Sequence, residues 1–288
     1  MNALQRGLVC CLAMALIGAP SISGALTLLD NFNSKTIDPE VWWGSEHGSA
    51  PDTPIEEVLR GTVPNTFTGV GRLLGLVLTS YGDRLSNTGS VRQEQGLNMQ
   101  DPGGITGLKA NVVIHKATAE SCLANPDPSR TGTRLIGALF NSVSAAQSGT
   151  GDRTGDVLAT FEKVLDSGTG AVPIPKHHIV AFLILCDNAD CTSSTVLPGA
   201  VTFTKSWAFD VSQELEWEWV NVSNEVVFTV GPGSLHPEAH AVNYSQVNKG
   251  GPGSDFKSVR VFTEEAACTA ARRQSSTEAG FDNVLTNP

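Results

Sequence analysis

The sequence has no excess of positive charge. It carries 19 lysines and arginines against 29 aspartates and glutamates, which gives a net charge of −10 at pH 7. Nucleic-acid binding and attachment to anionic membranes both depend on cationic side chains close to phosphate groups. The composition therefore argues against a nucleic-acid partner and against a protein held at an anionic bilayer surface.

Long apolar runs are also missing after residue 25. Every later apolar stretch is interrupted by polar residues before it reaches the roughly 20 residues that cross a bilayer. Residues 1–25 have the organisation of a secretory signal, with Arg6 ahead of the apolar run "GLVCCLAMALIGA" and small residues up to Ala25. We expect cleavage before Leu26, no membrane insertion after cleavage, and a soluble protein that is secreted or periplasmic.

Several common catalytic and metal-binding motifs are missing as well. No G-x-S-x-G nucleophile motif occurs, and the glycine-rich "SGTGDRTGD" lacks the G-K-[ST] ending of a phosphate-binding loop. "HPEAH" places His236 and His240 four residues apart, but it contains Pro237, and no third ligand stands at a recognisable spacing. We expect "HPEAH" to be a loop, and the sequence gives little support for zinc.

No charged block, proline-rich linker or internal repeat divides residues 26–288. Removing 25 residues from 288 leaves 263. All-β sandwiches of this length often form one domain. We therefore predict a signal peptide over 1–25 and a single domain over 26–288.

Only four of the six cysteines remain after signal cleavage: Cys122, Cys186, Cys191 and Cys268. An even number in an exported chain favours disulfides, with three possible pairings. "CDNADC" is a short polar loop, so Cys186–Cys191 is the local choice, and Cys122–Cys268 would then join distant segments. The alternative is a metal site, but C-x₄-C lies at the edge of the usual ligand spacing and no second pair follows. We predict disulfides.

What the sequence does contain is a succession of short β-strands separated by glycine, proline, asparagine and serine. The expected strands are 26–32, 72–80, 108–115, 133–141, 156–164, 178–186, 200–209, 214–221, 225–230, 256–262 and 279–286. The stretch 178–186 is apolar almost throughout, so we expect it at the centre of a sheet, covered on both faces. We expect a polar loop over 81–104 and a short helix over 264–274, with acids at its start and arginines at its end. The pattern predicts an all-β sandwich or jelly roll.

Both ends of this region resemble a known superfamily. "LLDNFNSKTIDPEVWWG" (28–44) is similar to the opening of concanavalin A-like lectin/glucanase sandwiches, and "AGFDNVLTNP" (279–288) is similar to their closing strand. Segments between them, such as "GDVLATFEKV", resemble uncharacterised exported bacterial members. The resemblance implies an antiparallel two-sheet jelly roll with adjacent first and last strands. It does not imply one activity, because lectins, hydrolases and adhesion modules share the fold.

The stretch "ELEWEW" (214–219) carries the catalytic hypothesis. On a strand, Glu214, Glu216 and Glu218 share one face, and the outer two have Cα atoms about 13 Å apart. Retaining glycosidases need two carboxyl groups roughly 5–5.5 Å apart. The pattern resembles the E-x-D-x-E strand of the β-glucanase family, which implies Glu214 as nucleophile, Glu218 as acid/base and Glu216 as helper. The chain departs from that family in two ways. Glu216 stands where the family has Asp, and the strand lies late in the chain, whereas the family's catalytic strand lies near the middle.

A structural interpretation of the same stretch is preferred. If "ELEWEWVN" and "EVVFTV" form a hairpin around Ser223-Asn224, then Trp219 faces Phe228 and Trp217 faces Val230 on the core side. The glutamates then occupy the solvent side. Alternation of this kind is the ordinary signature of a half-buried strand.

Two further sets of residues are candidates for binding. Trp42, Trp43 and Trp207 would stack on sugar rings if exposed, although tryptophan is usually buried. Sandwiches of the resembled type often hold a structural calcium near their termini, which implies Asp30 and Asp282 as ligands because both stand in "DN" contexts on strands expected to be neighbours. Calcium takes carboxylate and carbonyl oxygens, and the alternative is that both are plain surface acids.

Three hypotheses follow from these patterns. The first is a non-catalytic module that binds a glycan or another cell-surface ligand. The second is a glycoside hydrolase that acts on a β-glucan-type polysaccharide through the glutamate strand. The third is a structural or adhesive surface protein without a small ligand. The sheet face that the three glutamates occupy, and whether that face is open, distinguishes them.

Overall fold

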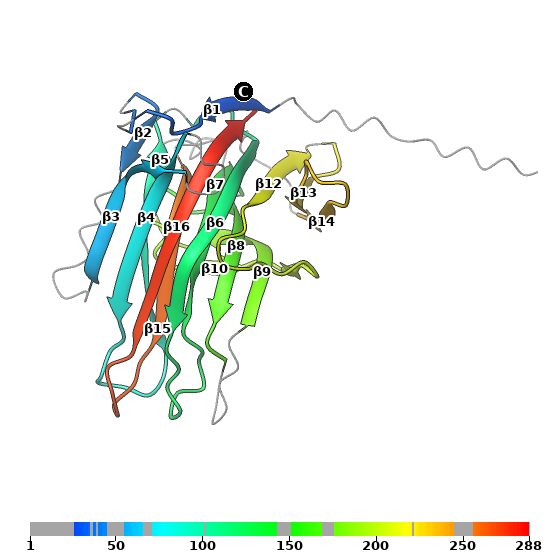
Figure 1. The fold of residues 1–288 in the computed structure, drawn as a ribbon. Coiled ribbons are helices and arrows are strands. Elements are labelled where there is room, and N and C mark those ends of the chain that lie inside the picture. The colour runs from blue at the N-terminus through cyan, green and yellow to red at the C-terminus, as the bar shows by residue number, and fades with distance from the viewer. Residues whose placement is uncertain are drawn as a thin grey trace, which may run out of the picture.

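A computed structural model describes residues 26–34, 37–38, 40–44, 55–65, 71–100, 102–142, 151–168, 176–220, 222–244 and 256–287, with only the backbone for 43–44 and 55–62. The signal predicted over 1–25 lies outside this part. The described chain forms two antiparallel sheets packed face to face (Figure 1). No helix of the described residues is long and apolar enough to cross a membrane.

The first sheet, called sheet A, has the strand order β14-β13-β12-β6-β16-β4-β3, with β1 beside β16. Its strands are β1 (Thr27–Asp30), β3 (Ile55–Pro64), β4 (Arg72–Tyr81), β6 (Gly107–Ala119), β12 (Gln213–Val220), β13 (Glu225–Val230), β14 (Glu238–Asn243) and β16 (Gln274–Thr286). The pairing of β1 with β16 confirms that the first and last strands are neighbours.

The second sheet, called sheet B, has the order β10-β9-β8-β7-β15-β5-β2, with β11 beside β9. Its strands are β2 (Trp42–Gly44), β5 (Ser90–Met99), β7 (Arg130–Asn141), β8 (Asp156–Asp166), β9 (Lys176–Cys186), β10 (Ser194–Val196), β11 (Val201–Thr202) and β15 (Lys257–Ala266). Sequence-distant strands such as β5 and β15 lie side by side, as a jelly roll requires. The predicted all-β jelly-roll sandwich is confirmed.

The main core lies between the two sheets. Alternate residues of each strand point inward, as the period of two predicts. From sheet A, Leu76 and Leu78 of β4 are fully buried, and from sheet B, Val259 and Val261 of β15 are fully buried. A second, smaller cluster lies on the other face of sheet B, where Ile136, Ala138, Leu158, Ile184, Cys186 and Phe256 pack together.

The prediction for the apolar stretch 178–186 is wrong in one respect. It forms most of β9, but beyond β9 lie only the short strands β10 and β11. Among the described strands, β7, β8 and β15 are buried on both faces along nearly their whole length. The apolar residues of β9 on its outer side are instead explained by the cleft described below, which they line.

Four other local predictions are also corrected. The tract 81–104 contains a ten-residue strand, β5, whose polar side chains find partners on neighbouring strands. The stretch 264–274 is not a helix, because Glu264–Ala266 continue β15 against β5 and β16 starts at Gln274. Of 200–209, only Val201–Thr202 pair as a strand, and the end of "HPEAH" begins β14.

Both predicted disulfides are present. Cys122–Cys268 joins the loop after β6 to the loop after β15, and Cys186–Cys191 closes the turn after β9, with Cα separations of 5.7 Å and 4.8 Å. Disulfides are typical of proteins from oxidising compartments.

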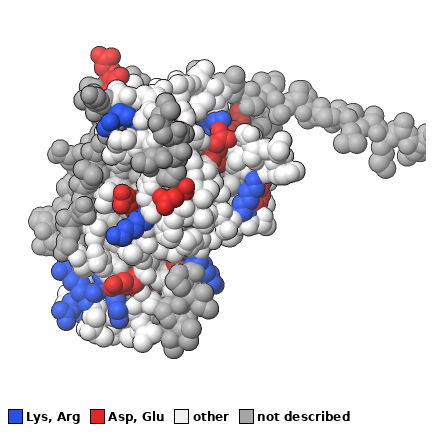
Figure 2. Space-filling model, viewed as in Figure 1, with Lys and Arg blue, Asp and Glu red and all other residues white. Residues whose placement is uncertain are grey.

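Figure 2 shows the outer face of sheet A, which lies in front in Figure 1. Acidic and basic side chains are scattered over the upper part of this face. Basic side chains gather at its lower end, near the loops that lead out of β4 and into β16. The cleft described below lies on the opposite sheet and is not visible from this side.

Candidate functional site

The glutamate strand forms β12 of sheet A and pairs with β13 as a hairpin. Trp217 pairs with Phe228 and Trp219 with Val226. The predicted register is therefore wrong, because each partner on β13 lies two positions away from the predicted one. The loop holds four residues between Val220 and Glu225, where the prediction allowed two. The predicted faces are right, because this shift moves the partner by two positions and keeps every side chain on its own side.

The two tryptophans of this strand belong to the core. Trp217 and Trp219 are 0% and 6% exposed. Phe228, the partner of Trp217, stands edge-on to Phe161 of β8 with ring centroids 5.5 Å apart. Packing against the opposite sheet therefore explains the aromatic half of "ELEWEW".

The three glutamates lie on the outer face of sheet A and are half-buried. Glu214 is held by Lys109, with Nζ 3.6 Å from Oε1, and accepts a hydrogen bond of 2.8 Å from the backbone N–H of Gly233. Burial, together with repulsion from Glu218 and Glu214, raises the pKa of Glu216 against the pull of Lys109. None of the three glutamates lines the cleft of sheet B.

The described tryptophans proposed as sugar platforms are enclosed. Trp42 is 2% exposed and donates from Nε1 to Oδ2 of Asp30 at 2.8 Å. Trp207 is 3% exposed and donates to the carbonyl oxygen of Val164 at 3.0 Å. The side chain of Trp43 lies outside the described residues. Neither Trp42 nor Trp207 presents an open ring face for stacking.

The two candidate calcium ligands lie near each other, as the β1–β16 pairing predicts. Burial raises the pKa of Asp282, and the charge of Asp30 raises it further. Asp282 also accepts a hydrogen bond of 3.2 Å from Asn65, and Asp30 accepts one of 2.7 Å from the backbone of Phe32. Among the described residues, no three His, Cys, Asp or Glu side chains gather as a metal-binding group. Calcium binding stays a prediction.

A cleft of about 1110 Å³ lies on the outer face of sheet B. Outward side chains of β5, β7, β8, β9 and β15 line it, together with residues of β10 and β11. Five arginines, three glutamates and one aspartate are among these residues. Clefts that combine apolar surface with a few convergent polar groups are the usual form of a ligand site.

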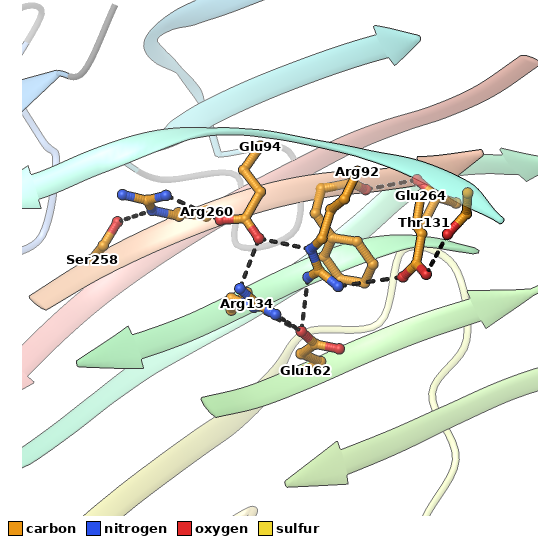
Figure 3. A network of polar contacts seen from close by, with 10 residues as sticks. Arg92, Glu94, Thr131, Arg134, Glu162, Ser258, Arg260 and Glu264 are labelled. Atoms are coloured by element: carbon orange, nitrogen blue, oxygen red, sulfur yellow. Dashed lines mark hydrogen bonds and ion pairs between the residues drawn. The ribbon is translucent and has the colours of Figure 1, made fainter. Parts of the chain in front are cut away.

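A network of ion pairs holds together part of the cleft lining (Figure 3). Glu94 accepts hydrogen bonds from Arg92, Arg134 and Arg260 at 2.8, 2.7 and 3.0 Å. Glu162 is shared by Arg134 and Arg92 at 2.6 and 2.9 Å. The five residues come from β5, β7, β8 and β15, so the network links four strands and fixes the position of each side chain.

The arginines keep both carboxylates of this network ionised. Burial on its own would raise the pKa of Glu94, but Arg134, Arg92 and Arg260 outweigh it and hold the pKa well below its usual range. Burial opposes ionisation at Glu162 too, and Arg134 and Arg92 again lower the pKa. A glycosidase acid must be protonated before it can donate. Glu94 and Glu162 are therefore kept in the form that pairs with arginines, which is not the form that donates a proton.

The other part of the cleft is apolar. Val180, Phe182 and Ile184 of β9 point into it. Next to them lies the ring of Phe256, with the guanidinium carbons of Arg153 and Arg260 at 4.3 and 4.7 Å from its centroid. These distances are typical of cation–π contacts. The cleft thus presents an apolar strip beside a charged one.

The sequence hypotheses missed this site, although a signal was present. Arg92 and Glu94 were placed in the predicted loop over 81–104, and the outward charges of the other strands were not considered together. Arg130 and Arg134 on one strand, and Arg260 and Glu264 on another, stand at spacings that place each pair on one face. Charged residues at alternate positions of four strands would have indicated a charged sheet face.

No family model matches the chain, and no curated protein sequence matches it. Among solved structures, the Bacteroides ovatus mixed linkage glucan PUL (MLGUL) GH16 in complex with a G4G4G3G product is 9% identical, with 89% of this chain and 97% of that chain covered and a TM-score of 0.45. The alginate lyase from Klebsiella pneumoniae is 8% identical, with 79% and 84% covered and a TM-score of 0.40.

The lectin II from Ulex europaeus is 8% identical, with 86% of this chain and 99% of that chain covered and a TM-score of 0.30. The strand order and pairing of the chain's own sheets identify the fold as an antiparallel jelly-roll β-sandwich.

Proposed function

We propose that residues 26–288 form one exported, non-catalytic glycan-binding module and that the cleft of sheet B is its ligand site. The observation that carries the proposal is the network of Glu94 and Glu162 with three arginines in a cleft of about 1110 Å³. Small-molecule sites occupy about 300–1,000 Å³. A cleft slightly larger than that range suits an oligosaccharide segment.

The network would bind sugar through groups that are already in place. Guanidinium N–H groups suit the hydroxyl groups of a sugar edge. Ion pairs between strands hold these groups before the ligand arrives, which reduces the entropy lost on binding. The apolar strip of Val180, Phe182 and Ile184 suits the less polar face of a sugar ring.

The second candidate function is hydrolysis of a β-glucan through the glutamate strand. One observation favours it, because a raised pKa such as that of Glu216 is the property of a general acid. The resemblance, however, assigns the acid role to Glu218. Glu214, its implied nucleophile, is engaged by Lys109 and Gly233. We therefore keep hydrolysis as the alternative.

Binding and hydrolysis are separated by one panel of soluble polysaccharides. Affinity electrophoresis of the purified protein measures binding, and release of reducing ends measures hydrolysis. We expect at least one polysaccharide to bind without being cleaved. Cleavage that disappears in Glu214→Gln and Glu218→Gln would establish the alternative, and no binding to any polysaccharide would reject the glycan-binding proposal.

A bulky substitution in the wall of the cleft locates the site. Thr202 is exposed and lines the cleft, so Thr202→Trp should weaken binding at least about tenfold, a change of about 1.4 kcal/mol. Val222 is 99% exposed in the β12–β13 hairpin loop, and Val222→Trp is the matched control. Equal affinities in the two variants would place the ligand elsewhere.

A further inference from the structure

The acids that line the cleft already have partners. Glu94 and Glu162 are shared among three arginines, as described above. Glu264 accepts from Ser90 at 2.9 Å and from Arg92 at 3.4 Å. Asp190 accepts from the hydroxyl of Thr192 at 2.9 Å. A ligand that enters the cleft therefore meets acids whose charge or hydrogen-bonding capacity is largely used.

Arg153 is different: its charge acts on Asp190 and lowers the pKa of that carboxyl, but no ion pair joins its guanidinium to an acid within the described part of the chain. Its side chain stands over the ring of Phe256, 4.3 Å from the centroid. The backbone of Arg153 is fixed by hydrogen bonds to the neighbouring turn, including one of 2.8 Å from its N–H to the carbonyl oxygen of Ala189. Arg153 is thus held beside the cleft with its donor groups available.

Positive charge accumulates around this position. Arg260 contacts the same Phe256 ring, and all three arms of its guanidinium are engaged by Ser258, Asn98 and Glu94. Burial lowers the pKa of Arg260, and the charges of Arg134 and Arg153 lower it further against the attraction of Glu94. An incoming anion would relieve this repulsion between cations.

A second arginine with unused donors stands at the far end of the cleft. The side chain of Arg130 is 43% exposed and contacts Asp166 through Nε at 3.2 Å. Its terminal nitrogens have no partner among the described residues. In the sheet, Arg130 is the backbone partner of Asp166 at the end of β8. The backbone carbonyl of Arg153 accepts a hydrogen bond from the backbone N–H of Asp156 at the start of β8.

The length of β8, whose two ends hold the backbones of the two arginines, indicates the length of the ligand. β8 has 11 residues, so its ends are about 33 Å apart at about 3.3 Å per residue. One small anion cannot reach both ends of such a cleft. A chain that carries negative groups at intervals can reach both.

From this arrangement we infer that the cleft takes a polyanionic saccharide, bearing carboxylate or sulfate groups, and that Arg153 and Arg130 contact those groups at its two ends. The inference rests on the proposed glycan binding and narrows it to one class of ligand. Guanidinium groups bind both carboxylate and sulfate-like oxyanions through paired N–H donors. The cleft carries five arginines against four acids in a protein whose net charge is −10, so the attraction is local to the cleft.

The sharpest test compares polysaccharides that differ only in charge. Polygalacturonate and its methyl ester share a backbone, as do dextran sulfate and dextran. Affinity electrophoresis should show binding to at least one charged member and at least about tenfold weaker binding to its neutral partner, since a hydrogen bond to a charged group contributes about 1.5–3 kcal/mol. Binding to polygalacturonate alone identifies carboxylate as the ligand group, and binding to dextran sulfate alone identifies sulfate.

Single variants then test the two residues. Arg153→Gln and Arg130→Gln should each weaken binding of the charged polysaccharide by about tenfold, with an unchanged melting temperature. Arg84 is exposed in the loop between β4 and β5, so Arg84→Gln removes the same charge away from the cleft and should have no effect.

Three results would overturn the inference. If the neutral partner binds as well as the charged one, or if only neutral polysaccharides such as laminarin bind, the ligand is not anionic although glycan binding stands. If Arg84→Gln weakens binding as much as Arg153→Gln, the attraction is not specific to the cleft. If neither charged nor neutral polysaccharides bind, the proposed function fails with the inference.

Discussion

The Nζ atom of Lys163 lies 3.0 Å from the carbonyl oxygen of Val112, so a lysine inside the sandwich bridges β8 of sheet B and β6 of sheet A. The side chain is fully buried, and its amine also lies 5.8 Å from the ring centroid of Trp207. Burial lowers the pKa of Lys163 to about 7. The hydrogen bond thus joins the two sheets through an amine that is costly to charge.

The first prediction concerns this cost. Below pH 7 the amine is charged in both the folded and the unfolded chain, and the fold bears the full cost of burying it. Between about 7 and the ordinary value of 10.5 the folded chain loses the proton first, so its stability rises with pH. We expect Lys163→Met to be more stable than the wild type at pH 6 and to lose that advantage by pH 10, as measured by urea unfolding. Lys116 is exposed on β6, and Lys116→Met should show no such trend.

The second prediction concerns Glu265, a carboxyl buried on the inner side of β15. Its Oε1 accepts from Ser129 at 2.9 Å, and burial raises its pKa to about 7 from 4.5. The folded chain therefore keeps the proton longer than the unfolded chain, and stability falls as pH rises from about 4.5 to 7. Glu265→Gln should match the wild type near pH 4 and exceed it by up to about 3 kcal/mol at pH 8. A constant difference across this range would contradict the raised pKa.

The third prediction concerns Glu94, the carboxylate shared by three arginines. Glu94→Gln leaves Arg134 and Arg260 buried with less compensating charge. Loss of such a partner should lower the free energy of unfolding by about 3–5 kcal/mol. Glu264 lies at the rim of the cleft with Arg92 at 3.4 Å, so Glu264→Gln should cost about 1 kcal/mol or less. Urea unfolding at pH 7 measures both variants. Equal losses would mean that the network does not stabilise the fold.

The fourth prediction concerns calcium at the chain ends. If Asp30 and Asp282 bind calcium, added calcium should raise the melting temperature of the wild type, because a ligand of the folded state stabilises it by mass action. A chelator should reverse the effect, and Asp282→Asn should remove it. A melting temperature that responds to neither calcium nor chelator would reject the site.

The fold was predictable because burial has a simple period in most strands. In "ELEWEW" the alternation places Trp217 and Trp219 on the core side in either register. Only the choice of their partners on β13 depends on the turn between β12 and β13. A Ser-Asn pair specifies a two-residue turn weakly, and the chain uses a longer loop in which Asn224 adopts a positive φ of 52°. The faces therefore followed from the sequence, whereas the register did not.

The cleft was not predictable in the same way, because its residues depend on partners far along the chain. The sequence of β5 has the composition of a polar loop. Its charged residues find their partners far along the chain, since Arg92 pairs with Glu162 and Glu94 with Arg260, 70 and 166 positions away. The prediction of a helix over 264–274 was wrong for the same reason. Its local charge pattern favours a helix, but pairing of β15 with β5 and the disulfide at Cys268 hold the segment in the sheet and the following loop.

The last prediction compares the two disulfides. Cys122–Cys268 joins residues separated by 146 positions, whereas Cys186–Cys191 spans 5. Because a crosslink restricts the unfolded chain more when it closes a longer loop, the entropy model gives about 5 kcal/mol for the first and about 2 kcal/mol for the second. Cys122→Ala with Cys268→Ala should therefore destabilise the fold more than Cys186→Ala with Cys191→Ala, as measured by urea unfolding. The reverse order would show that local packing around the Cys186–Cys191 turn, which borders the cleft, outweighs the restriction of the unfolded chain.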